Sequence, residues 1–256
     1  MRLSLSRLLY ALGAIGFGIC ALVWHDISNW AQLKSLAEGP RETAIYVVAA
    51  IEILGGIAIL WPKTVRAGTA AVGAVYFIFA LLGVPSIIAH PLVYNGYGNF
   101  FEQFSLASGA MILYGTAASG SVRRTGLALI GYYGFGVCLI SFALEQYFYL
   151  SATASLVPKW IPPGQMFWAI ATTIAFALAG IALLTGFMAR LAAVLATAML
   201  LGFGLLVWLP AILSDPHSFT NWSEGVETLA VAATAWIVAD FLHAASRANE
   251  PVYNAA

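Results

Sequence analysis

The chain has 256 residues, of which 61% are apolar and only 9% are charged. In a soluble domain about a quarter of the residues are charged. This composition therefore excludes an ordinary soluble protein and favours a protein whose outer face contacts lipid. The formal net charge of +0 provides no basic surface for nucleic acid, and no nucleic-acid partner is expected.

Eight apolar segments are long enough for helices that cross the hydrocarbon layer, which takes about 20 residues. In chain order the predicted helices span 7–25, 43–61, 65–89, 99–118, 126–149, 165–186, 190–213 and 223–243. The first segment follows Arg2 and Arg7 like the core of a signal peptide, but no convincing cleavage site follows it. We expect it to be retained, and we predict an all-α, polytopic membrane protein with eight transmembrane helices.

The cations indicate the orientation of these helices. Placed with its N-terminus inside, the chain has eight of its eleven Lys and Arg residues on the inner side. The inner ones are Arg2, Arg7, Lys63, Arg66, Arg123, Arg124, Arg190 and Arg247, and the outer ones are Lys34, Arg41 and Lys159. Because cytoplasmic loops are enriched in Lys and Arg, we predict that both termini are cytoplasmic and that the chain lies in a bacterial inner membrane.

The second half of the chain echoes the first. Gly16-Phe17-Gly18-Ile19-Cys20 recurs as Gly134-Phe135-Gly136-Val137-Cys138, an offset of 118. Arg66 falls on Arg190 at an offset of 124, and Pro85 and Glu102 fall on Pro210 and Glu227 at an offset of 125. Four helices per half make both halves cross in the same direction, which is a parallel repeat. The predicted modules are two four-helix bundles, 1–120 and 121–246, followed by a tail at 247–256.

Three further segments carry a likeness to a known family. The first helix is glycine-rich and ends in His25, and Glu52-Ile53-Leu54-Gly55-Gly56-Ile57-Ala58-Ile59-Leu60 is followed by Arg66. In the second half, 179–193 runs from Ala179-Gly180-Ile181 to Arg190-Leu191-Ala192-Ala193. Each half thereby resembles a DoxX-type four-helix module, so the chain resembles a tandem duplication of it. The second half departs from the pattern, because Ala143 and Phe176 stand at the positions that match His25 and Glu52.

Polar side chains inside the predicted spans form the candidate site. These are His25, Glu52, Glu102, Glu145 and Glu227, which lie mostly toward the outer ends of their helices. An ionised acid in the middle of a span costs about 2.5–3.5 kcal/mol on insertion scales. Glu52 must therefore be protonated, paired or in contact with a wet cavity, and a pair with His25 is a hypothesis. The acids nearer the helix ends, like Asp26 and Glu224, can instead meet water at the interface.

Aromatic residues are abundant on the same outer side. An interfacial belt accounts for most of them, but four are candidates for the wall of an outer-leaflet pocket: Trp24, Tyr97, Phe101 and Trp222. An acid beside an aromatic wall fits a flat lipophilic ligand such as a quinone, whose reduction takes up protons.

Other chemistry finds little support in the sequence. The four histidines, His25, His90, His217 and His243, do not share a helix face at metal-ligand spacing, so no metal is predicted and haem is disfavoured. Cys20 and Cys138 occupy matching depths and are expected to be packing residues, with a redox pair as the alternative. No catalytic residue can be assigned.

The resemblance implies a membrane subunit of a quinone-linked oxidoreductase complex, which anchors a protein partner and presents an outer-leaflet quinone site. Such a chain is at most one subunit of an enzyme. Two alternatives stay open: a non-catalytic assembly or maturation factor for a membrane or periplasmic enzyme, and a small-solute or proton-coupled transporter. The predicted partners are the lipid bilayer and a protein subunit, and quinone is the candidate cofactor.

Overall fold

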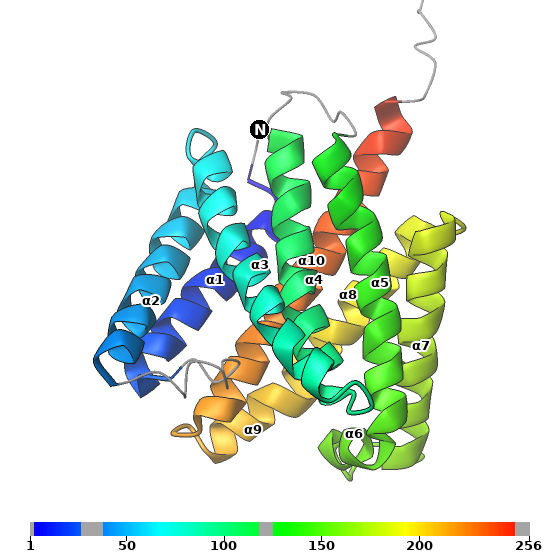
Figure 1. Ribbon diagram of the computed structural model, residues 1–256. Helices are drawn as coiled ribbons and strands as arrows, with labels where there is room; N and C mark the ends of the chain where they lie inside the picture. Colours follow the sequence, from blue (N-terminus) through cyan, green and yellow to red (C-terminus); the bar gives the residue numbers. More distant parts are fainter. Residues whose placement is uncertain (1–2, 27–37, 118–124, 249–256) are drawn as a thin grey trace, which may run out of the picture.

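The computed structural model describes residues 3–26, 38–117 and 125–248 (Figure 1). Within these ranges the chain consists of helices and turns and has no β-strand. The helices are α1 Leu5–Trp24, α2 Glu38–Leu60, α3 Val65–Ala89, α4 Asn95–Ala117, α5 Gly126–Phe148, α6 Leu150–Leu156, α7 Gln165–Thr185, α8 Ala189–Phe203, α9 Leu209–Ser214 and α10 Phe219–Ala248. A π-helical segment, η2 Gly204–Trp208, joins α8 to α9.

Seven helical stretches of the described chain are long and apolar enough to cross a membrane. They are α1, α2, α3, α5, α7, the continuous stretch α8–η2–α9, and α10. Their outward faces carry exposed large apolar side chains, such as Leu54 at 65% and Leu195 at 58% exposure. So much exposed apolar surface is unfavourable in water and stable in lipid. The structure is therefore compatible with a polytopic membrane protein.

The predicted span 99–118 corresponds to α4, which has 23 residues but is not among the seven apolar stretches. Its polar residues include Glu102, Gln103 and Ser108. Twelve of its 23 residues are buried inside the protein. A helix surrounded by other helices has little contact with lipid, so it need not be apolar on every face.

The other predicted helices agree with the observed ones to within a few residues, apart from 43–61, where α2 begins earlier at Glu38. Two features were not predicted. The first is α6, a short helix directly after α5. The second is η2, which interrupts the helix predicted at 190–213. Both of these features belong to the second half of the chain.

The helices form a closed ring. Along the ring, α1, α2, α3, α4, α5, α7, α8 and α10 each pack on the next, and α10 packs back on α1. Across the ring α4 contacts α10, and both lie near the middle of the bundle (Figure 1). The start of α1 and the end of α10 lie at the same end of the molecule.

Each contact in one half has a counterpart in the other. The pairs α1–α2, α2–α3 and α3–α4 correspond to α5–α7, α7–α8 and α8–α10, and α4–α5 corresponds to α10–α1. One hydrophobic core contains residues from both halves, including Tyr76 and Phe135. The predicted modules 1–120 and 121–246 are thus packed as a single unit.

Small residues allow the helices to approach closely. A Cβ at Gly13 of α1 would lie 2.8 Å from the Ala230 Cβ of α10, and one at Gly131 of α5 would lie 2.5 Å from the Ser108 carbonyl oxygen of α4. Small residues at such contacts are typical of membrane helix packing. Gly16 and Gly18 of α1 also face neighbouring helices, so the glycines of this helix serve close packing.

Candidate functional site

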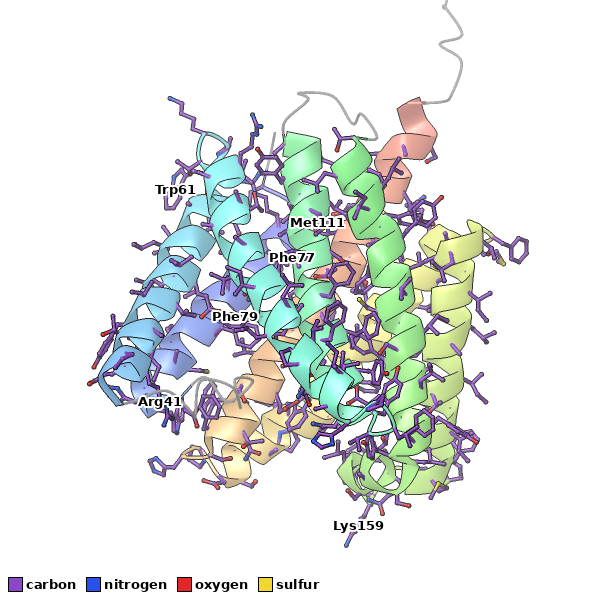
Figure 2. All side chains as sticks on the ribbon, viewed as in Figure 1. Arg41, Trp61, Phe77, Phe79, Met111 and Lys159 are labelled. Carbon is purple, nitrogen blue, oxygen red and sulfur yellow. The ribbon has the colours of Figure 1, made fainter. Side chains whose placement is uncertain are left out.

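A cavity of about 390 Å³ lies between α4, α5, α6, α7, α8, η2 and α10. This volume falls in the range of small-molecule sites, roughly 300–1,000 Å³. The lining reaches α6 and the loop that follows it, and Lys159 of this loop lies at the end of the bundle opposite to the start of α1 and the end of α10 (Figure 2). The cavity therefore occupies the half of the bundle that lies farther from these two helix ends.

Four acids line this cavity. Glu102 comes from α4, Glu145 from α5, and Glu224 and Glu227 from α10, where their i, i+3 spacing places them on one face. No Lys, Arg or His is among the described residues of the lining. Four like charges repel strongly in a medium of low dielectric, so full ionisation of all four carboxyl groups is unfavourable.

The remaining lining is largely apolar and aromatic. Its deep part is formed by buried residues, among them Phe142, Phe176 and Leu200. At its rim, Leu156 is 50% exposed and Leu206 is 42% exposed. The cavity thus joins a carboxyl cluster to an apolar rim that faces the outside of the bundle between α6 and η2.

The π-helix forms one side of the cavity. The Leu209 N–H donates to the Gly204 carbonyl oxygen five residues back, instead of four as in an α-helix. Leu206, Val207 and Trp208 of η2 all line the cavity, and no residue of η2 or α9 is buried. Single π turns within α-helices are often found at functional sites.

The sequence offset between matching residues of the two halves changes at this same place. Arg66 falls on Arg190 at an offset of 124, whereas Pro85 falls on Pro210 at an offset of 125. One extra residue therefore lies between Arg190 and Pro210. An i→i−5 turn accommodates one residue more than an α turn, and η2 lies in this interval. The residues after the π turn can then keep the helix face that their counterparts use in α3.

The segment between α5 and α7 forms another side. Tyr149, Thr153 and Val157 line the cavity. The Gln165 side-chain amide donates to the Val157 carbonyl oxygen at 2.6 Å, which ties the segment to the start of α7. On α5, the Gln146 amide oxygen accepts hydrogen bonds from the Thr172 and Thr173 hydroxyls of α7, at 3.2 and 3.1 Å.

The structure brings Glu102, Glu145 and Glu227 together, but places Glu52 and His25 elsewhere. Glu52 is 2% exposed and lies on α2 against Gly18 of α1. His25 is exposed and ends α1 with its ring 5.9 Å from that of Tyr46. Among the described residues the only ion pair joins Arg41 to Asp26. The hypothesis of a Glu52–His25 pair is not supported by this geometry.

None of the four aromatic residues predicted for the pocket wall lines the cavity. Trp24 at the end of α1 lies beside Trp222 near the start of α10, with ring centroids 6.4 Å apart and ring planes tilted by 39°. Tyr97 stacks on Tyr94, and Phe101 packs against Phe100. The aromatic wall consists instead of Phe142, Tyr149, Trp168, Phe176, Phe203 and Trp208. This correction arises because a sequence places a residue along a helix but does not fix which way that helix is turned.

Glu224 was expected to meet water at the interface and instead lines the cavity. Its position three residues before Glu227 was the signal for this, because such residues share a helix face. Phe176, which stands at the position matching Glu52, is also part of the wall.

Neither the cysteines nor a metal-ligand cluster adds to this site. Cys20 and Cys138 are both buried and free. Among the described residues, no group of three or more His, Cys, Asp and Glu side chains is arranged to hold a metal ion.

No family model, curated protein or solved structure matches this chain.

Proposed function

We propose that the chain is an inner-membrane subunit of a quinone-linked oxidoreductase complex and that the acid-lined cavity receives the quinone head. The observation that carries this proposal is the joining of four carboxyl groups to an aromatic wall and an apolar rim. A quinone diffuses in the lipid, so an apolar rim suits its entry. Carboxyl groups can donate hydrogen bonds to its oxygens and exchange the protons that its reduction takes up.

In this proposal α4 crosses the membrane as well as the seven apolar stretches, which makes eight transmembrane helices. Both termini then lie in the cytoplasm. The burial of α4 supports its crossing despite its polar residues. Among the described cations, Lys63 and Arg66 follow α2 near Trp61, whereas Arg41 and Lys159 lie at the other end (Figure 2). Arg7 and Arg190 lie in the first turns of α1 and α8, at the first of these ends. An excess of cations at the end with the termini fits the positive-inside rule.

The proposed architecture is a parallel duplication of a DoxX-type four-helix module. The equivalent helix contacts of the two halves support it. The position of η2 supports it further, because a π turn explains the change of offset between Arg190 and Pro210.

The proposed complex includes a protein partner that delivers electrons to the quinone or accepts them from it. The test is purification of the chain from its native membrane in a mild detergent, followed by organic extraction and mass spectrometry of the bound lipids and subunits. We expect bound quinone and a redox subunit with the parent chain, and much less quinone with Glu227→Gln. A chain that purifies alone and free of quinone would overturn the proposal.

A second candidate function is the transport of a lipophilic cation. The acidic lining without a described basic residue favours it, because a cation would neutralise the cluster. Tetraphenylphosphonium and decylubiquinone serve as competing probes. Binding of tetraphenylphosphonium that decylubiquinone does not displace would favour transport over the quinone site.

A further inference from the structure

The Glu145 carboxyl of α5 lies against the backbone of α4 at Gly98. A Cβ built on Gly98 would lie 2.6 Å from the Glu145 Cδ, and both carboxyl oxygens are also among its nearest atoms. Real Cβ atoms essentially never come so close to another heavy atom. The missing side chain at Gly98 therefore creates the niche that this carboxyl occupies.

Hydrogen bonds hold the two helices together on both sides of the niche. The Tyr94 hydroxyl donates to the Ser141 carbonyl oxygen at 3.2 Å and lies 2.9 Å from the Ser141 hydroxyl. The Asn95 N–H donates to the Tyr149 hydroxyl at 3.2 Å. Ser141 and Glu145 are four residues apart on one face of α5, and Tyr149 follows at the same interval directly after the helix ends.

Gly98 differs from glycines that merely let two helices approach. At Gly131 the nearest atom to an added Cβ is a backbone oxygen, which cannot move without shifting a helix. At Gly98 the three nearest atoms all belong to the end of a flexible side chain. An added methyl group would displace the Glu145 carboxyl and leave the helices in place.

We propose that Gly98 is a positioning residue, which holds the Glu145 carboxyl against α4 at the wall of the cavity. The expected effect on quinone binding rests on the proposed function, whereas the expected displacement of the Glu145 carboxyl does not. With Gly98→Ala, the carboxyl leaves its niche and enters the cavity.

The first readout is the reaction of Glu145 with dicyclohexylcarbodiimide, an apolar reagent for protonated carboxyl groups, followed by peptide mass spectrometry. In Gly98→Ala we expect labelling of Glu145 to rise several-fold, with Glu224 as the reference in the same sample. Gly83→Ala is the matched control, because its Cβ would meet Phe100 at an ordinary contact distance of 3.6 Å. Unchanged labelling of Glu145 in folded Gly98→Ala would overturn the proposal.

The second readout is rescue by a shorter acid. Glu145→Asp withdraws the carboxyl from position 98, so Gly98→Ala should have little effect on labelling or folding in that background. If Gly98→Ala alone fails to fold, folding of the double variant supports the contact, and failure of the double variant contradicts it. Equal effects of Gly98→Ala in both backgrounds would also contradict it.

A third measurement separates this inference from the proposed function. With decylubiquinone as the probe, Gly98→Ala should weaken binding about fivefold, which is the loss expected for one ordinary hydrogen bond. If the parent does not bind decylubiquinone, the quinone site is wrong, while the labelling result still decides the role of Gly98.

Discussion

Single acidic residues have different roles in this molecule according to what surrounds them. Glu227 is 7% exposed and shares a cavity with three other acids, whereas Glu52 is 2% exposed and packs between α1 and α2. An acid deep within a span is predicted to need surroundings other than lipid. Whether it meets a cavity depends on the packing of helices that are distant in the sequence.

Glu52 and His25 should respond independently to substitution. Glu52→Ala removes a buried side chain and should lower the free energy of unfolding by about 2–4 kcal/mol. His25→Asn alters an exposed residue at φ 50°, a conformation that Asn tolerates. It should change the free energy of unfolding by less than about 0.5 kcal/mol. Thermal unfolding in detergent measures both. Defects of equal size would instead favour a Glu52–His25 pair.

Removing one acid from the cavity should stabilise the unliganded protein. Glu224→Gln relieves repulsion among four carboxyl groups and should raise the free energy of unfolding by up to about 1 kcal/mol. The same variant should bind decylubiquinone less tightly, since functional sites often retain unfavourable groups. Glu42→Gln, at an exposed acid of α2, is the control and should change neither quantity. A destabilised Glu224→Gln would mean that this carboxylate is needed for folding.

At the scale of elements, the second half departs from the first at two insertions, and both border the cavity. The longer segment after α5 contains α6, and the extra residue in the helix after Arg190 coincides with η2. In the first half, α3 is a continuous helix and the large side chain of Tyr76 is buried in the core. The cavity thus lies where the two halves have diverged.

Deleting one residue of η2 should therefore close the cavity without unfolding the bundle. Leu205 is 64% exposed and does not line the cavity, so its deletion lets the π turn become an α turn. We expect a folded protein that no longer binds decylubiquinone. Deletion of Leu195 in α8 is the control, because it rotates the following residues by about 100° around the helix and should prevent folding. Retained binding after loss of Leu205 would contradict this role of η2.

At the scale of the whole molecule, the requirement that spans be long and apolar made the helices predictable. The segment at 65–89 agrees with α3 at both ends. The π turn could not be predicted, because its residues are as apolar as their neighbours and only the change of offset at Pro210 records it. Three of the cavity acids were identified as intramembrane polar groups, but none of the four aromatic residues predicted for the wall lines the cavity. Helix rotation and packing decide which aromatic residues face inward.

The topology can be tested through single cysteines and a maleimide that does not cross membranes. Cys20 and Cys138 are buried, so they should contribute little background. With eight spans, Leu92→Cys and Lys159→Cys should react from the periplasmic side, and Lys63→Cys should react only after the membrane is opened. Reaction of the Leu92 and Lys159 variants from opposite sides would show that α4 or α5 does not cross.

We propose that the acid-lined cavity binds a lipophilic ligand of the quinone class. The most direct measurement is a titration of the purified chain with decylubiquinone, followed by tryptophan fluorescence, because Trp168 and Trp208 line the cavity. A side chain at Gly202 projects into open space beside the cavity, and one at Gly126 projects into open space away from it. We predict that the parent and Gly126→Phe show the same saturable quenching and that Gly202→Phe loses it. Equal quenching in all three proteins, or none in the parent, would contradict the claim.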